Sequence, residues 1–206
     1  FDPAVQARQW YHLLTQEEVN ALHRRSATFV EVIERINQRA RAQSKQLILR
    51  DWSHLDFTAV PFFETPSYEL TTADILRNSF EVIKTTTVRH PIDQWLSLRR
   101  LSIMDGQIDI EKFLYGYMQF AREADKIGFV RYEDFTEGPD HALKTICERL
   151  QLPFDPEYRK RWMHNTKITG DTSSNTKFKE IKPQQRKPME PGLAEEFARH
   201  NTYWEA

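Results

Sequence analysis

The stretch VIKTTTVRHP, residues 82–91, decides how this chain folds. Residues 82–88 are rich in valine, isoleucine and threonine, which predicts a strand. Pro91 stops that strand, and residues 93–103 then supply apolar side chains at helical spacing. A strand followed closely by a helix is the building unit of a parallel α/β sheet.

Outward from this stretch, helical and extended patterns alternate along the chain. A capping box at Thr15 to Glu18 starts a long predicted helix over residues 16–43. Because strands that alternate with helices form a parallel sheet covered on both faces, we expect a three-layer α/β/α fold with a parallel central sheet. The other predicted elements are strands at 47–49 and 129–132, and helices at 71–78, 109–126, 142–150, 156–164 and 192–203.

Length and composition narrow the classes of protein. The 206 residues predict one domain, residues 1–206, and an apolar content of 39% is too high for a disordered chain. No apolar run approaches the ~18 residues of a membrane span, and a net charge of −1 argues against a nucleic-acid partner. The single cysteine, Cys147, suits a reducing compartment, so we expect a cytoplasmic location.

Two polar side chains follow the 82–88 strand at a suggestive spacing. Arg89 stands at the strand end, and Ser97 lies eight residues later, inside the next helix. Ligands of parallel sheets bind at the carboxyl ends of the strands. A guanidinium there and a hydroxyl in the following helix can converge on one phosphate. The alternative is a surface arginine and an ordinary helix serine, and spacing alone favours that alternative.

A family resemblance changes this balance. The segment TVRHPIDQWLSL (residues 87–98) resembles the 3′-phosphate-binding segment of the sulfotransferases that use 3′-phosphoadenosine 5′-phosphosulfate, PAPS. The segment FVRYEDF (129–135) is similar to another segment of that family, and residues 143–153 resemble the helix that follows it there. The resemblance implies the P-loop-type sulfotransferase fold.

The same resemblance implies roles for three side chains. Arg89 and Ser97 would bind the 3′-phosphate, and Tyr132 would lie near the adenine. A core tyrosine with a satisfied hydroxyl remains an alternative for Tyr132.

The family's other hallmark is absent from these residues. Its phosphosulfate loop is a turn rich in glycine, serine and threonine after the first strand, yet residues 1–44 contain no glycine. The chain also begins with Phe1 rather than methionine. We expect the first strand and this loop to lie upstream of a truncated amino terminus; the alternative is a protein that lost the loop and cannot transfer sulfate.

Two candidate bases follow the predicted 47–49 strand. Sulfuryl transfer needs a group that takes the proton of the acceptor, and the segment LILRDWSH (47–54) offers Asp51 and His54. The intrinsic pKa of histidine, near 6.5, favours His54, with Asp51 orienting it. The alternative is that Asp51 caps a turn and His54 is an ordinary loop residue.

A basic segment lies late in the chain. Residues 158–187 hold nine lysines and arginines against two acids. Such a run is usually a solvated face, but the resemblance implies a loop that closes over the 3′-phosphate. The segment KITGD (167–171) is loosely similar to it, which makes Lys167 and Arg186 candidate phosphate contacts.

The predicted function is that of a PAPS-dependent sulfotransferase. It would transfer a sulfuryl group to a hydroxyl or amine of a small-molecule, carbohydrate or lipid acceptor and release adenosine 3′,5′-bisphosphate, PAP, without a metal ion. Two alternatives remain at this point: another small-molecule kinase or transferase with a P-loop fold, and a non-catalytic relative that binds a nucleotide or a partner.

Overall fold

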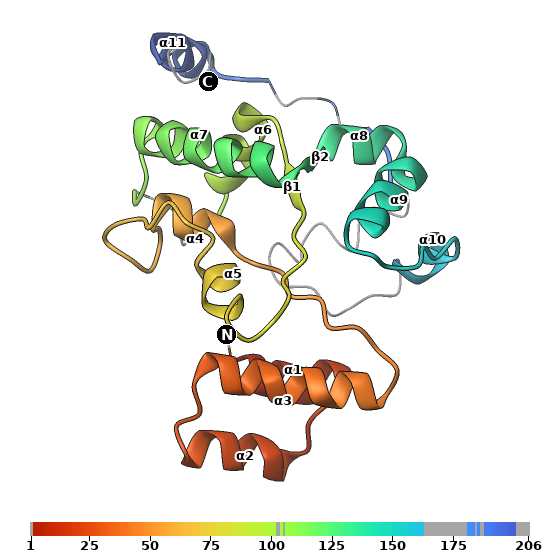
Figure 1. The fold of residues 1–206 in the computed structure, drawn as a ribbon. Helices are drawn as coiled ribbons and strands as arrows, with labels where there is room; N and C mark the ends of the chain where they lie inside the picture. The colour runs from red at the N-terminus through yellow and green to blue at the C-terminus, as the bar shows by residue number, and fades with distance from the viewer. Residues whose placement is uncertain are drawn as a thin grey trace. The chain divides into compact units, whose positions relative to one another are not determined.

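The computed structural model describes residues 2–101, 104, 106–162, 181–183, 185 and 188–200. Helices dominate this part of the chain, and two short strands pair in parallel (Figure 1). The fold is therefore mixed α/β. None of the helices in the described ranges combines the length and the apolar character that crossing a membrane requires.

The chain divides into two compact units. The first unit comprises Phe1–Asp51 and Thr72–Glu81, and the second comprises Trp52–Thr71 and Val82–Ala206. Each unit is described by itself below.

The first unit holds α1 (Pro3–Tyr11), α2 (Gln16–Arg24), α3 (Phe29–Ala42) and most of α5 (Thr71–Leu76). α1 packs against α2 and α3. Their facing sides are apolar, so burial of these side chains holds the helices together. The buried residues include Ala4, Ala7, Leu14, Val19, Leu22, Ile33 and Ile36.

The predicted single helix over 16–43 is wrong, because the chain breaks between α2 and α3. The expected capping box at Thr15 and Glu18 is present and starts α2. A second capping box then restarts the chain: Glu31 N–H donates to Thr28 Oγ1 at 3.3 Å, and Thr28 N–H donates to the Glu31 carboxylate at 2.7 Å. Ser26, with φ of 51°, makes the turn between the two helices.

The predicted buried strand at 47–49 is also wrong. These residues have no regular structure, and Ile48 and Leu49 are 61% and 41% exposed. An apolar run becomes a strand only where a neighbouring strand accepts its hydrogen bonds. In the described part of the first unit no strand is present to do so.

The second unit is built around β1 (Thr86–Val88) and β2 (Phe129–Arg131). Helix α6 (Pro91–Leu98) follows β1, and α7 (Ile110–Ile127) leads into β2 through Gly128, whose φ of 90° suits glycine. The remaining helices are α4 (Ser53–Thr58), α8 (Tyr132–Glu137), α9 (Pro139–Arg149), α10 (Tyr158–Trp162) and α11 (Pro191–Arg199), with α5 (Thr71–Leu76) crossing the boundary between the units.

Several predictions for this unit are confirmed. The parallel pairing of the two strands, the 109–126 helix and the strand at 129–132 agree with the structure to within one or two residues. β1 is shorter than its predicted span and covers residues 86–88. In this unit, α4 and α8 were not predicted. In the first unit, the predicted helix near 71–78 corresponds to α5, whereas α1 was not predicted.

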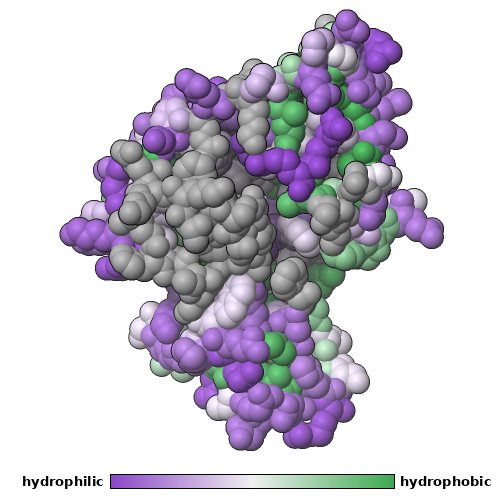
Figure 2. Space-filling model, turned by 180° about the vertical axis from the view of Figure 1, so that it is seen from behind, coloured by the Kyte–Doolittle hydropathy of each residue, from purple (hydrophilic) through white to green (hydrophobic). Residues whose placement is uncertain are grey.

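An apolar cluster joins α6, α7 and α11 in the second unit. Trp95 and Phe113 lie at its centre with ring centroids 5.1 Å apart, and Leu193 and Phe197 of α11 complete it. On the surface, by contrast with this apolar cluster, hydrophilic side chains dominate the described residues of the face that Figure 2 shows. Because Trp95 of α6 is buried in this cluster, the cluster fixes α6, the helix that begins just after Arg89.

Candidate functional site

Parallel pairing brings two predicted site residues to the same edge of the sheet. Val88 of β1 is in register with Arg131 of β2, so Arg89 and Tyr132 each follow the last residue of a paired strand. The Arg89 guanidinium carbon lies 4.8 Å from the centroid of the Tyr132 ring. This is a cation–π contact at the carboxyl edge, where parallel sheets bind their ligands.

Two hydrogen bonds fix the main chain around Arg89. The Tyr117 hydroxyl on α7 donates to the Arg89 carbonyl at 2.6 Å. The His90 N–H donates to the Glu133 carboxylate at 2.9 Å. Burial, with a smaller contribution from the nearby Glu133 charge, raises the pKa of Tyr117 to about 12, so this phenol stays a donor at neutral pH. The turn between β1 and α6 is therefore held from both sides.

The Arg89 side chain keeps an unused donor. Its Nε is buried and has no hydrogen-bond partner among the described residues. A buried donor without an acceptor costs free energy, and an anionic oxygen relieves that cost best when the donor belongs to a cation. An anionic oxygen would therefore be a favourable acceptor for this donor, beside the Tyr132 ring.

Ser97 lies at the other end of α6 from Arg89. Its Oγ accepts a hydrogen bond from Arg100 Nη2 at 3.4 Å. Ser97 stands on α6, the helix that starts at the Arg89 turn. Because a helix rises about 1.5 Å per residue, Ser97 lies about 9 Å along the helix axis from Pro91. A shared phosphate between Arg89 and Ser97 stays a prediction.

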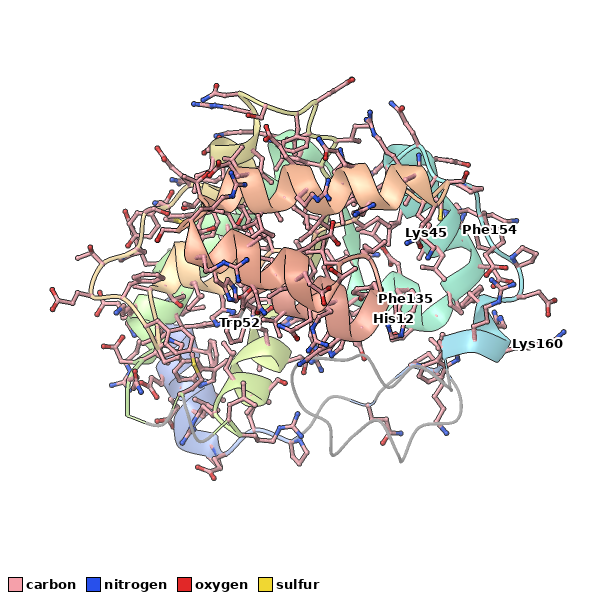
Figure 3. All side chains as sticks on the ribbon, turned by 90° about the horizontal axis from the view of Figure 1, so that it is seen from below. His12, Lys45, Trp52, Phe135, Phe154 and Lys160 are labelled. Carbon is pink, nitrogen blue, oxygen red and sulfur yellow. The ribbon has the colours of Figure 1, made fainter. Side chains whose placement is uncertain are left out.

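The two candidate bases fall in different units. Asp51, exposed at the end of the first unit, accepts a hydrogen bond from Thr72 Oγ1 at 3.0 Å. His54 lies half-buried on α4 of the second unit, with its ring edge-on to Trp52 at 4.6 Å between centroids. Trp52, labelled in Figure 3, directly precedes α4. The strand that was expected to position both side chains is not formed.

Lys167 and Arg186, the candidate lid contacts, lie outside the described residues. The start of the basic segment is described, and there the cations are paired with acids. Arg159 contacts Asp140 at 3.1 Å, and Arg161 contacts Asp155 at 2.8 Å. Lys160, labelled on α10 in Figure 3, pairs with Glu157 at 2.5 Å. These exposed pairs agree with a solvated face for this part of the segment.

Two further residues of the site were missed by sequence reasoning. Glu133 lies inside the FVRYEDF segment, but nothing local distinguishes its carboxylate from that of Asp134, which instead binds the Arg131 guanidinium. Tyr117 has no local signal at all, because its role depends on α7 packing against β1. Within the described ranges, no group of three or more histidine, cysteine or acidic residues is arranged to hold a metal ion.

Comparisons with protein-family models, with curated proteins and with solved structures find no match to this chain. The functional argument therefore rests on the residues and their geometry.

Proposed function

We propose that this chain binds PAPS and its product PAP through Arg89 and Tyr132, and that it belongs to a sulfotransferase with a three-layer P-loop fold. One observation carries the proposal: Arg89, with a buried and unpartnered Nε, lies over the Tyr132 ring at the carboxyl edge of a parallel strand pair. An anion and an aromatic base on one ligand match this pair of side chains.

The residues present fit such a nucleotide. The Nε of Arg89 would donate to the 3′-phosphate, and the hydroxyl of Ser97 would add a second donor from α6. The Tyr132 ring offers a planar apolar surface near the adenine. When bound, PAPS supplies the activated sulfuryl group for a hydroxyl or amine acceptor. Cys147, a free thiol, agrees with a cytoplasmic setting for this chemistry.

A second candidate function is nucleotide binding without transfer. The observation that favours it is the exposed, irregular segment at 47–49, which leaves Asp51 and His54 without the strand that was to position them. In that case the Arg89 site would still bind PAP.

Isothermal titration calorimetry with PAP tests the nucleotide site. Arg89→Ala should lower the affinity for PAP by about a hundredfold, because a charge-assisted contact to phosphate is lost. Arg131→Ala is the matched control, since this arginine is 62% exposed on the neighbouring strand and pairs with Asp134. Equal loss in both variants, or unchanged affinity in Arg89→Ala, would reject the assignment.

Transfer is tested separately from binding. PAP release from PAPS is measured with phenolic, carbohydrate and lipid-alcohol acceptors, using the full-length protein. If His54 is the base, His54→Ala should lose turnover while it still binds PAP. PAP binding without release for any acceptor would favour the non-catalytic module.

A further inference from the structure

An exposed group of aromatic side chains lies at α4 and on the loop that follows it in the second unit. Figure 1 shows the chain leaving the end of α4 as a wide loop, residues 59–70. Phe62 and Phe63 on this loop are 58% and 64% exposed, and Trp52, which directly precedes α4, is 39% exposed. The Trp52 and Phe62 rings lie with their centroids 6.1 Å apart. We call these three residues the aromatic patch; exposed apolar patches mark surfaces that bind a partner or a membrane.

Hydrogen bonds order the loop that carries this patch. The N–H groups of Phe62 and Phe63 both donate to the Ala59 carbonyl, at 3.1 and 2.8 Å. The Tyr68 N–H, late in the loop, donates to the Asp56 carbonyl of α4 at 2.9 Å. A ligand of the patch would therefore meet side chains on an ordered main chain, which lowers the entropy cost of binding.

The charges on this stretch of chain are negative. Residues 52–71 contain three acids and no lysine or arginine, and two of the acids, Glu64 and Glu69, are exposed. An anionic surface would be repelled here, whereas the outermost charge of a phosphatidylcholine bilayer is the choline ammonium. Acids attract this ammonium, and the faces of aromatic rings bind it through cation–π contacts. Tryptophan and phenylalanine also insert well at the boundary between headgroups and acyl chains.

We propose that the aromatic patch docks this protein on a membrane surface rich in phosphatidylcholine. Phe62 and Phe63 would insert at the boundary between headgroups and acyl chains, with Trp52 at the level of the headgroups and Glu64 among the choline groups. In this mode the protein lies on the membrane and does not span it. The docking does not depend on nucleotide binding or on sulfuryl transfer.

Flotation with phosphatidylcholine vesicles tests this docking. The wild type should float with the vesicles, and Phe62→Ser/Phe63→Ser should lower the partition coefficient at least about tenfold, because inserted apolar area is lost. Ile48→Ser is the matched control, since Ile48 is 61% exposed but belongs to the first unit. This control should float like the wild type. Absence of flotation for the wild type, or an equal loss in both variants, would overturn the proposal.

Quenching by brominated phosphatidylcholine tests which tryptophan reaches the membrane. Bromine in the upper part of the acyl chains quenches the fluorescence of an indole that comes close to it, and the chain has five tryptophans. Trp52→Phe keeps an aromatic ring for docking but should remove most of the quenching. Undiminished quenching in this variant would overturn the proposal, because another tryptophan would then lie at the membrane.

Three further measurements separate this membrane surface from other ligands. Glu64→Lys/Glu69→Lys should bind vesicles containing about one third phosphatidylglycerol about tenfold more tightly than the wild type, because lysines near an anionic surface attract it. Free phosphocholine at about 10 mM should not displace the protein from vesicles, because inserted apolar area rather than the headgroup alone holds it. Unchanged binding in the first case, or displacement in the second, would overturn the proposal. So would self-association in sedimentation velocity that Phe62→Ser/Phe63→Ser abolishes, which would assign the patch to a second copy of the chain.

Discussion

At the residue scale, hydrogen bonds fix the main chain at Arg89, whereas the Nε of its side chain has no hydrogen-bond partner among the described residues. The carbonyl of Arg89 is bound by Tyr117, and the next N–H is bound by Glu133. The guanidinium of Arg89 packs against the face of the Tyr132 ring, which restricts its position. A ligand at Arg89 would therefore meet a group that needs little reordering, which favours affinity.

Tyr117→Phe tests how much this anchoring contributes to stability. Loss of the hydrogen bond to the Arg89 carbonyl should lower the free energy of unfolding by about 1 kcal/mol at neutral pH. Urea denaturation followed by circular dichroism measures this change. A variant as stable as the wild type would show that the 2.6 Å contact contributes nothing.

The raised pKa of Tyr117 predicts the pH dependence as well. Burial, the main cause, raises this pKa from 10.0 to about 12, so the folded state holds the phenolic proton more tightly than the unfolded state. This stabilisation is complete below pH 10 and is lost as the pH rises towards 12. The wild type should therefore lose stability more steeply than Tyr117→Phe in this range. Parallel profiles would contradict the prediction.

At the scale of elements, the sequence was sufficient where a pattern was long and local. The apolar periodicity of residues 110–127 and the β-branched composition before Arg89 predicted α7 and the position of β1. The parallel pairing followed from their alternation, and with it the common edge of Arg89 and Tyr132.

Other elements depended on partners that the sequence does not reveal. The apolar run at 47–49 looked like a strand, but no strand in the described part of its unit pairs with it. A second capping box, formed by Thr28 and Glu31, starts α3. The apolar periodicity continues across this point, so the sequence pattern alone did not reveal the break. The Tyr117 contact depends on tertiary packing, which local patterns do not contain.

Helices α4 and α7 approach each other closely at Gly116. A Cβ atom at this position would lie 2.2 Å from the Phe57 carbonyl oxygen. Gly116→Ala should therefore lower the free energy of unfolding by about 1–3 kcal/mol, although alanine favours helix. Gly192→Ala on α11 is the control, because a Cβ there meets open space. Urea midpoints compare the two, and equal stability would contradict the close packing.

At the scale of the whole molecule, each of the two units buries apolar side chains of its own. Ile33 belongs to the first core, and Phe113 belongs to the second. The proposed nucleotide site lies in the second unit. Units with their own cores can open by different free energies.

Ile33→Ala tests this separation. The substitution should cost about 2–5 kcal/mol in the first unit, and amide hydrogen exchange should accelerate over α1 to α3. Affinity for PAP, measured by calorimetry, should stay unchanged, because Arg89 and Tyr132 lie in the second unit. A matching loss of PAP affinity would show that both units unfold together.

The pairing of β1 with β2 has a consequence for biosynthesis. Residues that meet at the strand ends, such as His90 and Glu133, are separated by 43 positions. Such a contact cannot form before the intervening residues have been synthesised, and closing the loop between them costs entropy. A ribosome-bound chain that has exposed Arg89 but not Tyr132 would carry the cation without its ring. PAP binding would therefore report that synthesis has passed β2.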